Sequence, residues 1–161
     1  MSNMAIAIYG AVLIALAPFN LANNSIADEE DLVACWRFDE GLGETAKDSS
    51  GNSNHGTIHG ARWVDGISGK ALKFDGRDDR VDCGENTITS IRNSSYTVEV
   101  WAKPSAPLTG DHYLMSFKNM RIGLSERAWI FWQGTPDWDS GYRATNTAAR
   151  AGTWHHVVGV F

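Results

Sequence analysis

Apolar and polar positions alternate along most of this chain, and glycine, aspartate and asparagine separate the alternating runs. In the segment 96–103, Val98, Val100 and Ala102 occupy every second position, which is typical of a strand with one face toward a core. The same reasoning predicts strands at Val33–Glu40, Thr57–Val64, Ala71–Phe74, Arg80–Gly84, Tyr96–Lys103, His112–Phe117, Met120–Ser125 and Ala128–Gln133. Short strands parted by turn residues predict an all-β, antiparallel two-sheet sandwich.

Two segments depart from simple alternation. Residues 47–56 consist almost entirely of turn-forming residue types, so we expect an irregular loop at the rim of the sandwich. The segment His155–Phe161 is apolar on both faces, with Val158 and Val160 alternating against Val157. This pattern predicts a strand that is covered on both sides.

Residues 5–19 form the only long apolar stretch, and the first charged side chain is Asp28. Its length suits the core of a secretory leader, and small residues precede a cleavage point after Ala27, which predicts a signal peptide at 1–27. A retained membrane anchor at residues 4–22 is the main alternative, and a buried core helix is less favoured because no polar face is present. We expect this segment to be helical or irregular and not to pack into the sandwich.

Length and charge narrow the range of functions. The chain has 161 residues, enough for one domain with a real core, and a net charge of −5. Its isoelectric point is near 5.4 and it has no run of Lys or Arg. Because nucleic-acid binding requires a basic surface, we expect no nucleic acid among the partners.

Six short motifs occur in a fixed order along the rest of the chain. They are Trp36-Arg37-Phe38-Asp39-Glu40-Gly41, Asp48-Ser49-Ser50-Gly51-Asn52, Asn54-His55-Gly56-Thr57, Gly69-Lys70-Ala71-Leu72-Lys73-Phe74-Asp75-Gly76, Tyr96-Thr97-Val98-Glu99-Val100-Trp101 and Trp154-His155-His156-Val157. Together they resemble the LamG-like jellyroll domains of the concanavalin A-like lectin/glucanase superfamily. The resemblance implies a jellyroll sandwich over residues 32–161 that binds carbohydrate or glycoprotein.

The same resemblance sets the expected domain organisation. Residues 1–27 are the predicted signal peptide, 28–31 an acidic linker, and 32–161 the LamG-like domain. Domains of this family usually continue past the Trp-His-His-Val motif into further strands, so the resemblance implies that C-terminal strands are missing. We expect the protein to be secreted or at the cell surface, and to contact a membrane only if residues 4–22 are retained as an anchor.

The two cysteines, Cys35 and Cys83, lie in separate predicted strands rather than in a Cys-x-x-Cys arrangement, which argues against zinc. In an exported domain an even pair favours a disulfide between them. The alternative is two small buried thiols that pack as apolar residues.

No enzyme motif is present. The chain lacks the Glu-x-Asp-x-x-Glu strand of the superfamily's laminarinases and any Gly-x-Ser-x-Gly elbow. Adjacent acids occur at Asp39-Glu40 and Asp78-Asp79, but neighbours in a strand point to opposite faces, and the same holds for His155 and His156. We therefore expect no catalytic residues.

Calcium is the better metal candidate, because it takes oxygen ligands from irregular loops. The residues of suitable type are Asp48, Asn52, Asp75, Asp78 and Asp79, and some members of the wider superfamily bind calcium at the sandwich rim. The alternative is that these side chains only stabilise turns.

Sugar binding needs an exposed aromatic ring framed by hydrogen-bonding groups. The densest such cluster comprises Trp129, Trp132, Gln133, Asp137, Trp138, Asp139 and Tyr142. Trp138 lies in a Gly/Pro/Asp-rich loop, where it either contacts a ligand or packs against the rim. The sequence therefore predicts a secreted, non-catalytic recognition module. The alternatives are a structural or adhesive domain and an accessory part of a glycoside hydrolase.

Overall fold

The computed structural model describes residues 6–15, 32–84, 96–117, 120–133 and 147–160, and every regular element in these segments is a β-strand. The strands are β1 Ile6–Ala15, β2 Leu32–Trp36, β3 Thr45–Ala46, β4 Gly56–His59, β5 Arg62–Asp65, β6 Lys70–Phe74, β7 Arg80–Asp82, β8 Thr97–Pro104, β9 Asp111–Phe117, β10 Met120–Ser125, β11 Ala128–Gln133 and β12 His155–Val160. Within these segments no helix is long and apolar enough to cross a membrane.

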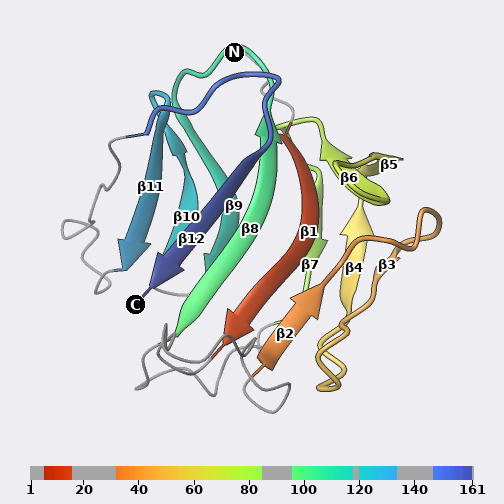
Figure 1. The fold of residues 1–161 in the computed structure, drawn as a ribbon. Helices are drawn as coiled ribbons and strands as arrows, with labels where there is room; N and C mark the ends of the chain where they lie inside the picture. Colours follow the sequence, from red (N-terminus) through yellow and green to blue (C-terminus); the bar gives the residue numbers. More distant parts are fainter. Residues whose placement is uncertain (1–5, 16–31, 85–95, 118–119, 134–146, 161) are drawn as a thin grey trace.

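The strands form two layers (Figure 1). One layer is a six-stranded sheet with the order β12-β8-β1-β6-β5, in which β2 also pairs with β1. The other layer contains two three-stranded sheets, β11-β10-β9 and β3-β4-β7. Every strand pair in both layers is antiparallel, so the prediction of an all-β antiparallel sandwich is confirmed.

The core lies between the two layers. In β8 the alternation predicted from sequence is confirmed, since Val98, Val100 and Ala102 are buried and the residues between them are half-exposed. From the opposite layer, Ile122 and Leu124 of β10 meet them in one apolar cluster. Burial of this kind stabilises by about 25 cal/mol for each Å² of apolar surface removed from water.

The N-terminal apolar segment differs from the expectation of an unpacked helix. Residues 6–15 form β1, which pairs with β8 along one edge and with β2 and β6 along the other. Periodicity alone does not separate a buried strand from a buried helix in an apolar run of this length. A strand with neighbours on both sides satisfies the backbone groups of such a run. The proposed cleavage point after Ala27 and the acidic linker at 28–31 lie outside the described residues.

The last strand also differs from its prediction. Among the described strands, β12 pairs with β8 only, at the edge of the large sheet. Val157 is buried, but Val158 is 44% exposed and Val160 is 72% exposed. β12 is therefore covered on one face in this structure, and the expected cover on both faces is not present.

The predicted disulfide is not formed, and both cysteines are reduced in this structure. Cys83 packs against the core cluster, whereas Cys35 lies on the other face of β2, where its thiol interacts with Arg37. Alternation along β2 therefore places the Cys35 thiol on the face that carries Arg37. Burial raises the pKa of Cys83 to about 12 and also raises the pKa of Cys35, which favours the protonated form of both thiols.

Candidate binding site

The sheet β11-β10-β9 presents one face to the core and one to solvent. Met120, Ile122 and Leu124 of β10 are buried in the core cluster. Arg121 lies between them in sequence, so its side chain points to the opposite face. There it is directly paired across the sheet with Trp132 of β11.

Arg121 joins two aromatic rings on this outer face. Its guanidinium carbon lies 4.8 Å from the ring centroid of Tyr113 on β9 and 5.6 Å from that of Trp132 on β11. Both distances are within the range of cation–π attraction. The three side chains therefore form a row across three strands, which we call the aromatic platform. Tyr113 is 46% exposed, so a ligand has access to it.

Gly123 is required for the position of Tyr113. It is paired with Tyr113 at a register shift between β9 and β10. A β-carbon at this position would collide with the backbone of His112 and Tyr113. The close approach of the two strands brings the tyrosine ring beside Arg121.

Of the aromatic residues predicted as sugar contacts, Trp129 lies in the core and Trp132 lies on the outer face of the sheet. Trp129 is only 4% exposed and belongs to the core, where its ring meets that of His155 edge-on at 5.2 Å. Trp132 is half-exposed and lies on the platform. Gln133 is paired with Met120 through its backbone, and its side chain lies outside the described part of the structure.

The remaining predicted contacts, Asp137, Trp138, Asp139 and Tyr142, also lie outside the described residues. Tyr113 and Arg121 were not among the sugar contacts predicted from the sequence. Alternation alone places each of them on the outer face of its own strand. Only the register of β9, β10 and β11 shows that they meet Trp132.

A second aromatic contact lies on the outer face of the large sheet. The ring of His156 stacks on Trp101 with centroids 4.7 Å apart and an angle of 14° between the planes. The Nε2 atom of His156 is 2.7 Å from the Oε1 atom of Glu99. His155 and His156 thus face opposite sides of β12, as predicted. His156 therefore covers one face of the Trp101 ring.

A cleft of about 580 Å³ lies beside the platform, between β9 and β7. Tyr113 belongs to both, because it also lines the cleft. The opposite layer contributes Trp36, Phe38 and Phe74 to the cleft wall. Clefts of this volume are typical of ligand sites.

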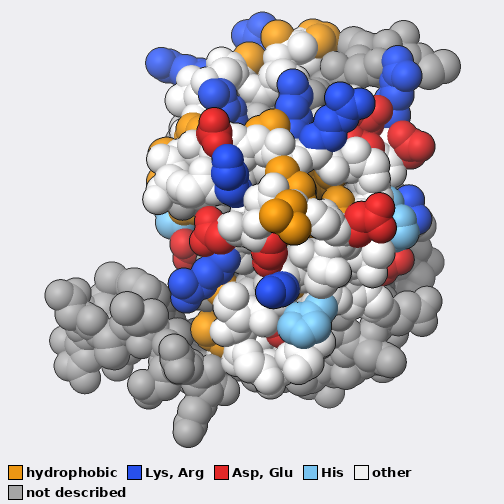
Figure 2. Space-filling view, turned by 90° about the vertical axis from the view of Figure 1, so that its right-hand side faces the viewer, with side chains coloured by type: hydrophobic (Ala, Val, Ile, Leu, Met, Phe, Trp, Pro, Cys, Tyr) orange, Lys and Arg blue, Asp and Glu red, His pale blue; other side chains and the backbone are white. Residues whose placement is uncertain are grey.

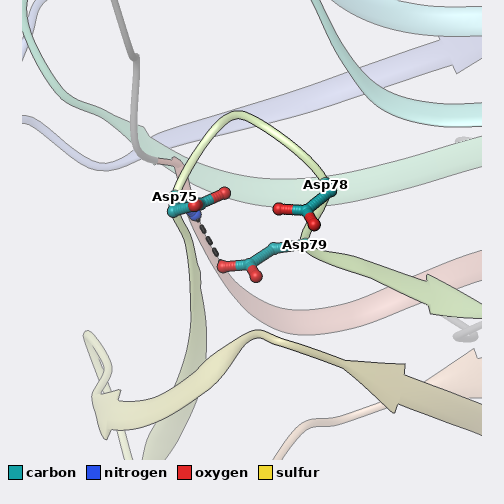
Figure 3. Close-up of side chains that lie close together, drawn as sticks. All are labelled: Asp75, Asp78 and Asp79. Carbon is teal, nitrogen blue, oxygen red and sulfur yellow. Dashed lines mark hydrogen bonds between the residues drawn. The ribbon is translucent and has the colours of Figure 1, made fainter.

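Three predicted calcium ligands meet in the turn between β6 and β7 (Figure 3). One oxygen from each of Asp75, Asp78 and Asp79 lies within 4.8 Å of the others. The carboxyl groups of Asp75 and Asp78 point toward each other across the turn. The backbone N–H of Asp75 donates a hydrogen bond of 2.8 Å to Oδ2 of Asp79. No other group of three potential metal ligands is found in the described residues.

Hydrogen bonding in the turn favours the ionised form of Asp75. The backbone N–H of Arg77 donates to Oδ1 of Asp75 at 2.8 Å, and this bond is the main reason that the pKa of Asp75 lies below its usual value. The adjoining turn is close enough that a β-carbon at Gly60 would strike the carboxylate of Asp79. Three hard oxygen donors suit Ca²⁺, which needs three to five more from carbonyl groups or water.

The other two predicted ligands, Asp48 and Asn52, lie in the loop at 47–56 and serve a different purpose. Both carboxylate oxygens of Asp48 accept hydrogen bonds, from the backbone of Cys35, Ser50 and Asn54 and from the Ser50 hydroxyl, at 2.8 to 2.9 Å. The amide of Asn52 donates to the carbonyl of Leu32 at 2.6 Å. The loop is therefore held to β2 by hydrogen bonds. These two residues do not join Asp75, Asp78 and Asp79, which we call the acidic turn.

Charge is mixed on the face of the molecule that Figure 2 shows. Figure 2 shows Lys and Arg side chains interspersed with Asp and Glu on the face over β3 to β6, with hydrophobic atoms in small separate groups. This view contains no uniform basic field of the kind that binds nucleic acid. It is consistent with the net charge of −5.

An antiparallel sandwich with an aromatic platform on one sheet has the architecture of a binding module. Residues 75–161 match the laminin G family model described as the concanavalin A-like lectin/glucanases superfamily. Because this match covers more than half of the 161 residues, the chain belongs to that superfamily. Neither curated proteins nor solved structures give a significant match to the chain.

Proposed function

We propose that this chain is a non-catalytic recognition module that binds carbohydrate, free or on a glycoprotein, at the aromatic platform. The observation that carries the proposal is the row Tyr113–Arg121–Trp132 on the outer face of β9, β10 and β11. Flat aromatic rings pack against the apolar face of a sugar ring, and a guanidinium donates hydrogen bonds to its hydroxyl groups. Membership of a lectin-containing superfamily supports the same function.

A pair of single substitutions tests the platform. Trp132→Ala is expected to weaken binding to any glycan identified on an array by tenfold or more, since aromatic anchors contribute about 2 kcal/mol or more at interfaces. Trp101→Ala is the matched control, because Trp101 is also half-exposed but lies on the other layer beneath His156. It is expected to leave glycan binding unchanged. The same loss of glycan affinity in both variants, or unchanged affinity in both, would contradict glycan binding at the aromatic platform.

Calcium at the acidic turn is a further part of the proposal, supported by the convergence of Asp75, Asp78 and Asp79. A cation that binds only the folded chain raises the melting temperature. We expect Ca²⁺ to raise Tm and EDTA to reverse the shift, with Asp78→Asn removing it. Asp65→Asn is the control, because Asp65 is equally exposed but pairs with Lys70 at 2.8 Å instead. A thermal transition that is the same in Ca²⁺ and in EDTA would argue against this site.

A structural or adhesive domain without a sugar site is the alternative function. The exposed Val158 and Val160 on the edge strand β12 favour it, because apolar side chains at a sheet edge are typical of contact surfaces. An accessory role beside a glycoside hydrolase is the other alternative. Glycan arrays together with hydrolysis assays on the bound glycans distinguish the three functions.

A further inference from the structure

Three basic residues lie in one row across the outer face of the large sheet. Lys103 of β8 is the cross-strand partner of Ala7 in β1, and Ala7 is in turn the partner of Lys73 in β6. On the other side of β6, Lys73 is paired with Arg62 of β5. We call Lys103, Lys73 and Arg62 the basic row. It crosses the end of the sheet where β1 begins, and Figure 2 shows Lys and Arg side chains gathered toward this end, at the top of the view.

The side chains of the basic row point away from the core. Leu72 and Phe74, on either side of Lys73 in β6, belong to the core cluster or pack against it, so alternation directs Lys73 to the outer face. The cross-strand partners of Lys73 share that face with it. Lys73 and Arg62 are exposed and Lys103 is half-exposed. All three are therefore accessible to a ligand.

The basic row has no acidic partner among the described residues. The ion pairs found there join Lys70 to Asp65 and His156 to Glu99, and neither includes a member of the row. Lys73 and Arg62 are directly opposite each other on adjacent strands, an arrangement in which like charges repel. An anionic group bound between them would replace this repulsion by two attractions.

The spacing of the charges restricts the kind of anion. Lys73 and Arg62 lie on adjacent strands and can share one anionic group, whereas Lys103 lies two strand spacings from Lys73, about 10 Å. Each strand of a nucleic acid carries a phosphate for about every 3.4 Å of its axis. The net charge of −5 opposes the approach of so dense a polyanion. A chain with widely spaced acidic groups fits the row better.

An aromatic ring at one end of the row favours a sugar chain. Nζ of Lys103 lies 5.9 Å from the ring centroid of Trp154, which is half-exposed and immediately precedes β12. An aromatic ring packs against the apolar face of a sugar, and an ammonium group beside it donates to the acidic group of that sugar. An acidic peptide would use the cations but not the ring.

We propose that the basic row binds a linear acidic glycan whose carboxylate or sulfate groups are separated by neutral sugar rings. One acidic group lies between Lys73 and Arg62, and the next contacts Lys103 beside Trp154. The row is on the opposite layer from the aromatic platform, so it is a second site that does not depend on glycan binding at Trp132.

Titration of the intact chain with a hyaluronan oligosaccharide, in which a carboxylate sugar alternates with a neutral one, tests the proposal. Calorimetry at low salt is expected to show binding that weakens as salt is added. Lys73→Gln should weaken it by roughly tenfold, because hydrogen bonds to charged groups are among the stronger ones. Lys70→Gln is the matched control on the same strand, since Lys70 is already paired with Asp65 at 2.8 Å. It should leave the affinity unchanged.

Thermal unfolding of the same variants separates ligand binding from a structural role. Because Lys73 is directly opposite a like charge, Lys73→Gln is expected to keep or raise the melting temperature while it weakens binding. A lower melting temperature together with the lost affinity would make Lys73 a structural residue and would overturn the proposal.

Matched ligands test the kind of anion. Chondroitin sulfate has the same alternation with added sulfate groups, so tighter binding of this glycan identifies sulfate as the preferred group. Polygalacturonate, with an acid on every ring, and an oligoglutamate peptide are both expected to bind more weakly than hyaluronan.

Equal or tighter binding of the peptide, no binding of either alternating glycan, or equal effects of Lys73→Gln and Lys70→Gln would overturn the proposal. Trp132→Ala is expected to leave hyaluronan binding unchanged. A failure at the basic row is therefore distinct from a failure at the aromatic platform.

Discussion

Removal of residues 1–27 is expected to abolish the cooperative thermal unfolding of this protein. The shortened chain lacks β1, which pairs with β8 on one side and with β2 and β6 on the other. At about 1 kcal/mol for each hydrogen bond, the lost pairing is comparable with the whole stability of a small domain, about 5–15 kcal/mol. Circular dichroism during heating measures the effect.

A peptide that copies Ile6–Ala15, with terminal lysines for solubility, is the matched control for this deletion. If the loss arises from an empty strand position, the peptide should restore a cooperative transition when added to the shortened chain. A shortened chain that unfolds as cooperatively and at the same temperature as the intact chain would show that the sheet does not need β1.

Substitution of Asp48 by Ala is expected to destabilise the fold by about 3 kcal/mol or more. Four hydrogen bonds end on this carboxylate, including one from the buried backbone N–H of Cys35. Each buried donor left without a partner costs about 1–3 kcal/mol. Asp75→Ala is the control, because that carboxylate is exposed and also accepts backbone hydrogen bonds. We expect this exposed substitution to cost much less stability than Asp48→Ala. Urea unfolding of both variants measures the difference.

The same carboxylate gives a pH dependence with a definite sign. Burial opposes ionisation of Asp48, but the hydrogen bonds from Ser50, Cys35 and Asn54 outweigh it, and the pKa of Asp48 lies below its ordinary value. The stabilisation is therefore complete above the unfolded pKa of about 3.9 and is lost as the pH falls through the lower folded value. The stability difference between the parent and Asp48→Asn should shrink below about pH 4. A difference that stays constant from pH 7 to pH 2.5 would contradict this role.

The positions of strands with a clear alternation of apolar and polar residues were predictable from the sequence. Met120–Ser125 and Ala128–Gln133 were predicted with the bounds that the structure shows, and β8 differs by one residue at each end. The reason is that successive side chains of a strand point to opposite faces of the sheet. A strand with one face in the core and one in water therefore alternates apolar and polar residues. The six ordered motifs also indicated the superfamily, and the match over 75–161 confirms it.

The tertiary structure decided which distant residues meet. An apolar run such as Ile6–Ala15 has no polar face, so its sequence is compatible with a helix or a central strand, and pairing with β8, β2 and β6 favours the strand. Likewise, the contact of Arg121 with Tyr113 and Trp132 depends on cross-strand register, including a shift beside Gly123. Register is set by packing of whole sheets rather than by any one strand. For this reason the sequence determined the strands and the superfamily, and only the folded sheets determined the platform and the cleft.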